Sequence, residues 1–454
     1  MLISLEGQKL WSKVFIWYIA TLINHLLPMK LNYILCGLLL AAGTPIFSQE
    51  LHTADPGEAG FSEERLSRID KMLDGYVSDR KIAGAVALIA HDGNIVYHKG
   101  IGYADIAEKR KMEPNTIFRI ASQTKAITSV AVMMLYEEGK LLLDDPVSRY
   151  IPEFKNPKVL DTFNPADSTY SAVPAKREVT IRDLLTHTSG IGYAVIGSKE
   201  TNAIYAKAGI PAGFVATPVK LGDKIKALGK LPLMHEPGEK FTYGLNIDVL
   251  GYVVEVVSGV SLDRFFHKRI FEPLQMDDTY FYLPKGKQDR LAEVYSENEG
   301  GETVPAPQVS HGGIDKDYPL LGSTYFSGGA GLSSTASDYA AFLQMLLNGG
   351  EYNGKHLLSP DTVRLMTVNQ IGEINLNHGN KFGLGFEVVG KRGSAVLPWH
   401  EGSFSWGGYF GSHYWVDPAS GIVAIILTQE VPNKEWGDIS AKFKNMVYAA
   451  HTGK

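Results

Sequence analysis

The apolar run that follows Ser122-Gln123-Thr124-Lys125 constrains the fold of this chain more than any other segment. Residues 126–135 are apolar around nearly the whole circumference of a helix, and the run closes at Gly139. A helix without a polar face is expected to lie buried inside a domain. The sequence therefore predicts a central helix on which the other elements pack.

Ser122 and Lys125 are expected to lie on one face of this helix, at its first turn, because residues three apart are neighbours on a helix. Desolvation and the positive end of the helix dipole both favour a neutral amine at Lys125, which could then accept the proton of the serine hydroxyl. The same spacing also arises by chance, and Ser78-Asp79-Arg80-Lys81 repeats it. That second copy lies in a polar stretch, so we expect it at the surface.

Composition narrows the classes of partner. The chain has 454 residues, of which 44% are hydrophobic and 20% charged, a balance typical of a globular protein with a large core. The net charge is -5 and no cluster of Lys and Arg stands out, so nucleic acid is not an expected partner. A small-molecule substrate is expected instead. The single cysteine, Cys36, and thirteen scattered histidines predict no metal site.

Two apolar stretches, residues 10–27 and 31–47, precede the globular part. The second follows Met29-Lys30 and ends at a plausible cleavage site after Ser48, so it predicts a secretory signal peptide from Met29 to Ser48 and a secreted or periplasmic protein. The first stretch contains polar residues and makes a poor membrane span. A membrane anchor formed by this N-terminal hydrophobic segment is the alternative.

Periodicity and turn residues place the remaining elements. A helix capped by Ser62 carries Leu66, Ile69, Met72, Leu73 and Tyr76 on one face. The predicted strands are residues 85–90, 95–98, 386–389, 409–416 and 422–427, and further helices are predicted at 336–347 and 439–450. Residues 144–320 are predicted to form helical segments joined by loops.

These elements indicate an α/β (α+β) fold in which the two ends of the chain share one lobe. Residues 1–48 are assigned to the signal peptide or hydrophobic extension, and residues 49–454 to a single domain. Within it, residues 50–143 and 321–454 form an antiparallel sheet flanked by helices, and residues 144–320 form a mainly helical lobe. We expect the functional site in the cleft between the lobes.

Five motifs occur in order along the chain: Ser122-Gln123-Thr124-Lys125, Leu184-Leu185-Thr186-His187-Thr188-Ser189-Gly190, Pro237-Gly238-Glu239-Lys240-Phe241-Thr242-Tyr243, Asp248-Val249-Leu250-Gly251 and Gly328-Gly329-Ala330-Gly331-Leu332. With this set, residues 56–446 resemble the serine β-lactamase and penicillin-recognising enzyme family. Within that family the chain looks most like the class C β-lactamase-like esterases called family VIII carboxylesterases. The resemblance implies a β-lactamase/transpeptidase-like fold and a serine hydrolase without a cofactor, in which Ser122 forms an acyl-enzyme.

The resemblance also implies a role for Tyr243, which matches the tyrosine of the family's Tyr-x-Asn motif. Leu245 stands where the asparagine belongs, and Asn246 comes one residue later. A phenolate at Tyr243 or a neutral amine at Lys125 would activate the hydroxyl of Ser122. Either residue remains a candidate for the general base.

Trp406-Gly407-Gly408 aligns with the family's third motif, which in the lactamases is usually Lys-Thr-Gly or His-x-Gly. Bare backbone at Gly407 and Gly408 would let an acyl carbonyl approach the strand closely. The backbone amides of Ser122 and Tyr409 would then form an oxyanion hole. Trp406 would offer an apolar wall to one side of a small ester or amide substrate.

His187 raises the alternative of a Ser/His/Asp triad. The chain has no Gly-x-Ser-x-Gly elbow, and Lys125 already supplies a base, so His187 is predicted to be structural. Two other activities stay open, a D-alanyl-D-alanine carboxypeptidase and a class C-like β-lactamase. A non-catalytic binding or sensor protein of the same fold is the alternative from another class.

The mature protein is expected to begin near Gln49. This follows from the signal-peptide pattern between Met29 and Ser48. N-terminal sequencing of the protein purified from its native host measures the start directly. A mature chain that retains residues 10–27 would instead support the membrane anchor.

Overall fold

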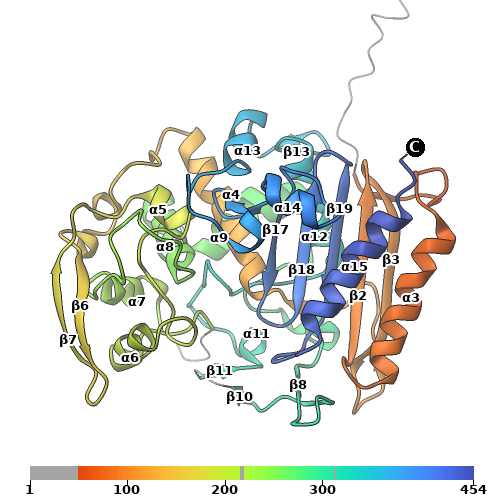
Figure 1. The fold of residues 1–454 in the computed structure, drawn as a ribbon, viewed down its shortest axis with the longest axis horizontal. Coiled ribbons are helices and arrows are strands. Elements are labelled where there is room, and N and C mark those ends of the chain that lie inside the picture. The colour runs from red at the N-terminus through yellow and green to blue at the C-terminus, as the bar shows by residue number, and fades with distance from the viewer. Residues whose placement is uncertain (1–49, 215–218, 311–312, 454) are drawn as a thin grey trace, which may run out of the picture. The chain divides into compact units, whose positions relative to one another are not determined.

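The computed structural model describes residues 50–214, 219–310 and 313–453 (Figure 1). The signal peptide predicted from Met29 to Ser48, and the apolar stretch before it, lie outside these residues. Ser48–Lys454 clusters as one compact unit. Within the described ranges, no helix is both long and apolar enough to span a membrane.

A nine-stranded sheet joins the two ends of the chain. Its strands follow the order β1-β3-β2-β19-β18-β17-β16-β15, with β4 beside β3, and every pair except β1 and β3 is antiparallel. The bounds are β1 His52–Thr53, β2 Gly84–His91, β3 Asn94–Asp105, β4 Arg110–Lys111, β15 Lys381–Phe382, β16 Glu387–Val388, β17 Phe404–Gly408, β18 Ser412–Asp417 and β19 Ile422–Leu427. The expected mixed α/β architecture with an antiparallel sheet is therefore confirmed.

Helices cover both faces of the sheet, so β2 and β19 are apolar and buried along their whole length. On one face lie α3 (Glu63–Ser78) and α15 (Trp436–Ala450), which pack on each other and on the sheet. The hydroxyl of Ser62 caps α3 by accepting a hydrogen bond from the amide of Arg65, as the sequence predicts. The opposite face packs against α12 (Ala336–Leu347).

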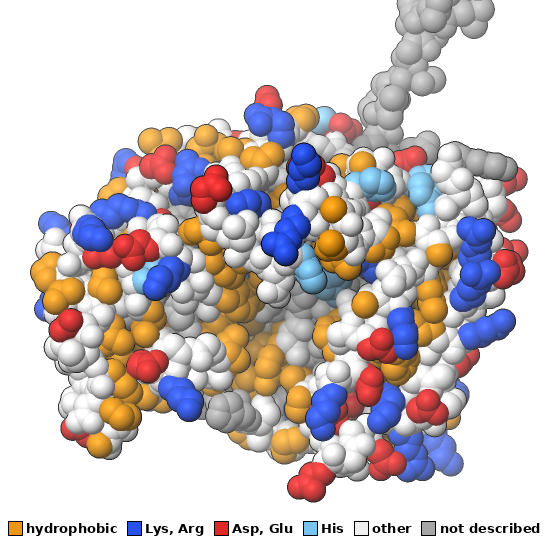
Figure 2. All heavy atoms as spheres, in the orientation of Figure 1, with side chains coloured by type: hydrophobic (Ala, Val, Ile, Leu, Met, Phe, Trp, Pro, Cys, Tyr) orange, Lys and Arg blue, Asp and Glu red, His pale blue; other side chains and the backbone are white. Residues whose placement is uncertain are grey.

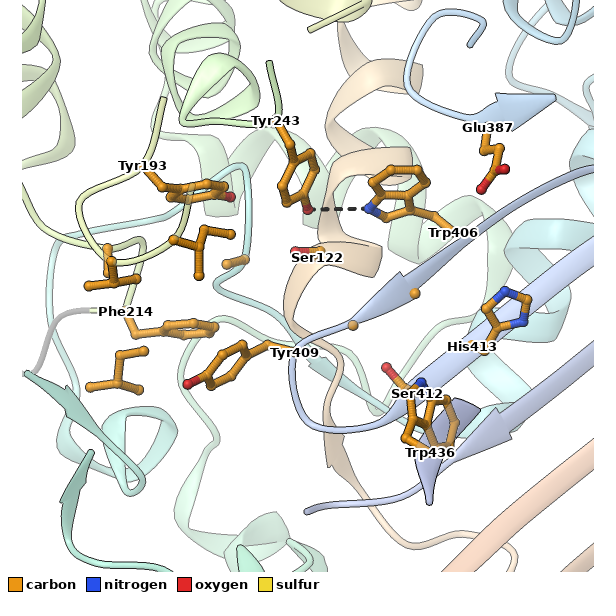
Figure 3. Close-up of a pocket in the computed structure, with 17 residues that line it drawn as sticks. Ser122, Tyr193, Phe214, Tyr243, Glu387, Trp406, Tyr409, Ser412, His413 and Trp436 are labelled. Atoms are coloured by element: carbon orange, nitrogen blue, oxygen red, sulfur yellow. Dashed lines mark hydrogen bonds between the residues drawn. The ribbon is translucent and has the colours of Figure 1, made fainter. Parts of the chain in front are cut away.

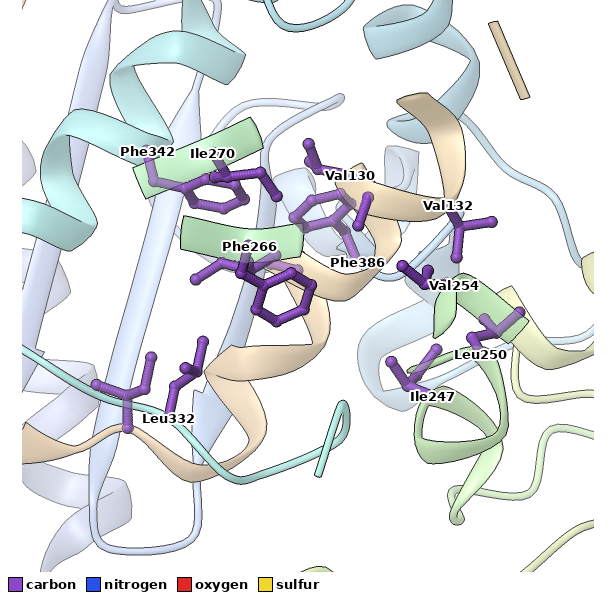
Figure 4. Packing of buried hydrophobic residues seen from close by; sticks show 14 of the residues in the cluster. Val130, Val132, Ile247, Leu250, Val254, Phe266, Ile270, Leu332, Phe342 and Phe386 are labelled. Carbon is purple, nitrogen blue, oxygen red and sulfur yellow. The ribbon is translucent and has the colours of Figure 1, made fainter. Parts of the chain in front are cut away.

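The predicted central helix is α4 (Thr124–Glu137), and every residue from Thr124 to Leu135 is buried. It packs against α8 (Asn246–Ser258) through apolar side chains from both helices (Figure 4). The α-helix begins two residues after Ser122, because residues 121–123 form a tight 3₁₀ turn. Ser122 and Lys125 therefore lie on either side of the junction between the turn and the helix.

The remaining elements are short. The other helices are α5 Ile181–Leu185, α6 Lys199–Lys207, α7 Leu221–Leu228, α9 Leu262–Phe266, α10 Glu272–Leu274, α11 Tyr318–Leu321, α13 Pro360–Met366 and α14 Lys391–Val396. Five two-stranded sheets pair β6 Lys158–Asn164 with β7 Thr169–Pro174, β8 Tyr295–Glu297 with β9 Thr303–Pro305, β10 Val309–Ser310 with β11 Ile314–Asp315, β5 Phe118–Arg119 with β12 Ser333–Ser334, and β13 Glu351–Tyr352 with β14 Lys355–His356.

Two expectations about these elements are wrong. Residues 144–320 are not only helices and loops, because the β6–β7 hairpin and two smaller ones interrupt them. β6 and β7 have no buried residue, so no alternation of apolar and polar residues marks them in the sequence. Residues 409–416 are not one strand: β17 ends at Gly408, residues 409–411 turn, and β18 begins at Ser412. The boundaries of the two lobes remain a prediction.

Leu250 of α8 supports the packing against α4. Leu250→Ala is expected to lower the free energy of unfolding by about 2 to 5 kcal/mol, because it leaves a cavity where a side chain is fully buried. Urea denaturation followed by circular dichroism measures the change. Val256→Ala in the same helix, where the side chain is 42% exposed, serves as the matched control and should cost far less. Equal losses in the two variants would contradict this account of the core.

Candidate active site

Ser122 lies in the 3₁₀ turn at the head of α4, where the backbone is held in an unusual conformation. Ala121, directly before it, has a φ of 45°, which non-glycine residues rarely adopt. The end of β17 packs against this turn. A Cβ added to Gly408 would lie 2.5 Å from the carbonyl oxygen of Ile120 and 2.3 Å from the hydroxyl of Ser412. Only glycine permits this approach of β17 to the turn that carries Ser122.

The amine of Lys125 is buried and touches three groups. Its Nζ lies 3.3 Å from Oγ of Ser122 and 2.8 Å from the hydroxyl of Tyr193, and it donates a hydrogen bond to the carbonyl oxygen of Gly329 at 2.8 Å. It also lies 4.7 Å from the centre of the Tyr243 ring. The structure thus brings the predicted pair Ser122 and Lys125 together and adds Tyr193 and Gly329 as partners of the amine.

The loop that supplies Gly329 is braced by a buried carboxyl group. Asp248 accepts hydrogen bonds from the hydroxyl of Ser327 and from the amide of Gly329, the latter at 3.2 Å. Burial raises the pKa of Asp248, and the nearby Lys125 opposes this rise. A Cβ on Gly329 would lie 2.2 Å from Asp248, so glycine is required there. The Gly328–Leu332 motif therefore holds a carbonyl group against the Lys125 amine.

Two tyrosines flank Lys125, and their surroundings differ. Burial, followed by the neighbouring Tyr243, raises the pKa of Tyr193 well above its usual value, so Tyr193 remains a neutral phenol. The hydroxyl of Tyr243 lines the cavity beside Ser122 and accepts a hydrogen bond from the indole of Trp406 at 3.2 Å (Figure 3). Both tyrosines line the cavity, and Tyr193 is the one whose hydroxyl is bonded to the Lys125 amine.

His187 lies behind Tyr243 and supports its loop. Its Nδ1 accepts hydrogen bonds from the side chain of Asn246 at 2.9 Å and from the amide of Gly244 at 3.3 Å, and its ring contacts the Tyr243 ring. Burial, with Lys125, lowers the pKa of His187 well below its usual value, so the imidazole is neutral. Asn246 is itself fully buried in this network, and neither it nor Leu245 lines the cavity. Among the residues that line the cavity there is no asparagine to match the one in the family's second motif.

The backbone amides of Ser122 and Tyr409 have no hydrogen-bond acceptor among the described residues. Tyr409 is the first residue of the turn after β17, and Gly408 before it packs against the Ser122 turn. A backbone amide without an acceptor is able to donate a hydrogen bond to a developing negative charge on a substrate oxygen.

The Ser122 hydroxyl opens into a cavity of about 360 Å³. Its lining residues are Ser122, Tyr193, Val195, Ile196, Ala212, Phe214, Tyr243, Ile314, Ala330, Glu387, Trp406, Gly407, Gly408, Tyr409, Ser412, His413 and Trp436. None of these is a lysine or an arginine. Glu387 is the one lining residue with a carboxyl group, and burial raises the pKa of that group. Figure 2 shows the hollow in the face of the molecule, with apolar side chains along one side of it.

Every site residue predicted from the sequence lies at this cavity or against it. Ser122, Tyr243, Trp406, Gly407, Gly408 and Tyr409 line the cavity, and Lys125 lies beneath Ser122. No motif in the sequence indicated Phe214, Glu387 or His413, because these residues come from segments that meet only in the folded chain. Tyr193 could have been found, because it follows Gly190 of a recognised motif by three residues.

Comparison with known proteins connects this geometry to a family. The beta-lactamase family profile matches residues 69–441. Protein Rv1367c of Mycobacterium tuberculosis is 34% identical over 367 residues, covering 78% of this chain and 87% of that protein. Esterase EstB of Burkholderia gladioli is 32% identical over 395 residues, covering 84% and 95%. Among solved structures, EstCE1, a hydrolase with promiscuous acyltransferase activity, has a TM-score of 0.72 and 30% identity, covering 85% and 99%.

Tyr193→Phe is expected to slow the reaction of Ser122 with a fluorophosphonate probe by about 10- to 100-fold. The substitution removes the hydrogen bond between the Lys125 amine and the phenol, and leaving a buried polar group without its partner costs about 1 to 3 kcal/mol. Labelling rates followed by mass spectrometry measure the effect. Tyr97→Phe, which removes a hydrogen bond to Asp70 away from the cavity, is the control and should label at the original rate. An unchanged rate in Tyr193→Phe would show that the phenol does not position the amine.

Proposed function

The chain belongs to the beta-lactamase family and is a serine hydrolase, and from this premise we propose that it is an esterase that cleaves small carboxylic esters through a Ser122 acyl-enzyme. The observation that carries the proposal is the Lys125 amine 3.3 Å from the Ser122 hydroxyl, at the edge of a cavity without a cationic lining residue. The relatives named esterase EstB and EstCE1 support an ester as the substrate.

In the first half of the reaction, Ser122 Oγ attacks the ester carbonyl carbon. Its proton passes to Lys125 or Tyr243, which lie on the two sides of the hydroxyl, while the carbonyl oxygen becomes negative and is held by the amides of Ser122 and Tyr409. The bond to the alcohol oxygen then breaks, and the alcohol leaves with the proton. Ser122 remains as an ester of the acyl group.

In the second half, water attacks the acyl-enzyme and gives up a proton to the same base. The carboxylic acid is released, and Ser122 recovers its hydroxyl. Tyr193 and Gly329 act indirectly, because they hold the Lys125 amine against Ser122. Tyr243, Lys125 and the two amides together are the machinery for both halves.

The surroundings of Ser122 favour neutral esters over β-lactams and D-alanyl peptides. Those compounds carry a free carboxylate, and the family's usual lysine in the third motif is replaced by Trp406, whose indole faces Tyr243. Glu387 in the same cavity would repel an anion whenever it is ionised. On the other side of Ser122, Phe214, Tyr409 and their neighbours form an apolar wall for an acyl group.

We also propose that the enzyme is exported, on the strength of the signal-peptide pattern from Met29 to Ser48. N-terminal sequencing of the native protein, described above, tests export separately from the activity.

The enzyme is expected to prefer p-nitrophenyl butyrate to nitrocefin in kcat/KM by at least about tenfold. A cation that binds the lactam carboxylate through a charge-assisted hydrogen bond contributes about 1.5 to 3 kcal/mol, which corresponds to roughly 10- to 100-fold in rate. A neutral ester needs no such cation. Steady-state assays of the purified protein with both chromogenic substrates give the ratio, and comparable values would favour a β-lactamase.

Two serine variants provide the controls for this assay. Ser122→Ala should abolish ester turnover and fluorophosphonate labelling together, because it removes the nucleophile. Ser78→Ala removes the other serine with a lysine three residues later, and Ser78 ends helix α3 outside the cavity. It should leave both measurements unchanged. Labelling of a serine other than Ser122 would refute the mechanism.

A further inference from the structure

The cavity at Ser122 has a second, polar end that the reaction at the ester carbonyl does not use. Glu387, Ser412, His413 and Trp436 line this end, and we call these four residues the polar arm. Figure 3 shows these residues toward the right of the site, away from Phe214, which belongs to the apolar wall on the left. A substrate bound at Ser122 therefore meets two chemically different surroundings.

Bare backbone connects the polar arm to the rest of the cavity. Within β17, only Phe404 and Ser405 pair with β16. The last three residues of β17 therefore have no paired strand on that edge among the described residues. Gly407 lies opposite His413 in the pairing of β17 with β18, and opposite residues point to the same face of an antiparallel sheet. A Cβ on Gly407 would lie 3.8 Å from Cδ2 of His413. Because Gly407 has no side chain, the imidazole is left uncovered on this flank.

The polar arm has hydrogen-bonding capacity that the described residues do not use. Nδ1 of His413 and Oγ of Ser412 are buried and have no hydrogen-bond partner among them. Glu387 accepts one hydrogen bond, from the side chain of Asn380 at 2.7 Å. Nδ1 of His413 and Oγ of Ser412 have almost no exposed surface, so the groups left for a ligand at this end are the second carboxyl oxygen of Glu387 and Nε2 of His413, which have no partner among the described residues.

Burial disfavours charge on the ionisable groups of the polar arm. Burial raises the pKa of Glu387, and burial, followed by Lys444, lowers the pKa of His413 well below its usual value. Lys444 of α15 interacts electrostatically with Glu387, and burial lowers its pKa to about 7. Its amine lies 3.2 Å from the centre of the Trp399 ring. A neutral hydrogen-bonding group needs no counter-charge from these residues and would be accommodated here.

We propose that the polar arm binds the alcohol part of the substrate, and that the natural substrates are esters of neutral polyhydroxylated alcohols, the class that includes glycerol and sugar esters. A hydroxyl group both donates and accepts hydrogen bonds, which suits the neutral imidazole of His413 and the carboxyl group of Glu387, whose register places them on one face of the sheet. The indole of Trp436 offers an apolar surface to the carbon-bound hydrogens of such an alcohol. This inference rests on the proposed esterase activity and adds the class of alcohol to it.

Three butyrate esters that differ only in the alcohol test the proposal: 1-butyrylglycerol, propyl butyrate and butyrylcholine. The first two have the same carbon skeleton and differ by two hydroxyl groups. Because all three give the same butyryl-enzyme, kcat/KM measured by pH-stat titration of the acid reports on recognition of the alcohol. The glycerol ester is expected to exceed the propyl ester by about tenfold, the factor expected from two hydrogen bonds between neutral groups.

Variants of the polar arm show whether this preference arises there. In Glu387→Leu and in His413→Phe, the ratio of the glycerol ester to the propyl ester should fall toward one, whereas Glu387→Gln, which keeps a hydrogen-bonding side chain, should retain part of it. Fluorophosphonate labelling of Ser122 shows that each variant is folded. Glu373→Leu is the matched control, because Glu373 is exposed and lies outside the cavity, and it should keep the original ratio.

The possible failures are distinguishable. Equal values for the glycerol and propyl esters, a preference that survives in both Glu387→Leu and His413→Phe, or a preference for butyrylcholine would each overturn the assignment of the polar arm while leaving the esterase intact. Absence of turnover with all three esters, together with failure of p-nitrophenyl butyrate, would overturn the proposed function itself.

Discussion

The Lys125 amine contacts Ser122 in a part of helix α4 that is buried on all sides. This burial requires that the surrounding residues supply hydrogen-bond partners for the amine. A polar group enclosed among apolar side chains must be paired. Tyr193 and Gly329 supply the partners from two different loops, and Asp248 fixes the second loop through its amide and Ser327. The reactivity of the serine is therefore a property of a network that spans distant parts of the chain.

Missing side chains shape the site as much as the side chains that are present. Gly408 lets β17 approach the Ser122 turn, and Gly329 lets its loop approach Asp248. Gly407 leaves the imidazole of His413 open to the cavity. The end of β17 thus packs against the Ser122 turn and lines the cavity beside it.

The sequence predicted the elements whose patterns are strong. Helix α12 and strand β19 have the expected bounds, because an apolar run with clear turn residues marks each of them. The strand pattern alone did not predict β17, because Gly407 and Gly408 weaken it, and only the resemblance of Trp406-Gly407-Gly408 to the family's third motif placed a strand there. Ser122, Lys125 and Tyr243 could be predicted from short motifs. Glu387 and His413 could not, because their relation to Ser122 exists only after the sheet has formed.

The pairing of β2 with β19 in the middle of the sheet affects the order in which the chain can fold. Val86 pairs with Leu427, so this pairing closes a loop that contains most of the protein, and such long-range contacts form late. Trp406 and the turn at Tyr409 belong to the same C-terminal segment as β19. A chain still in synthesis thus already contains Ser122 but lacks Trp406 and Tyr409, which line the cavity beside it.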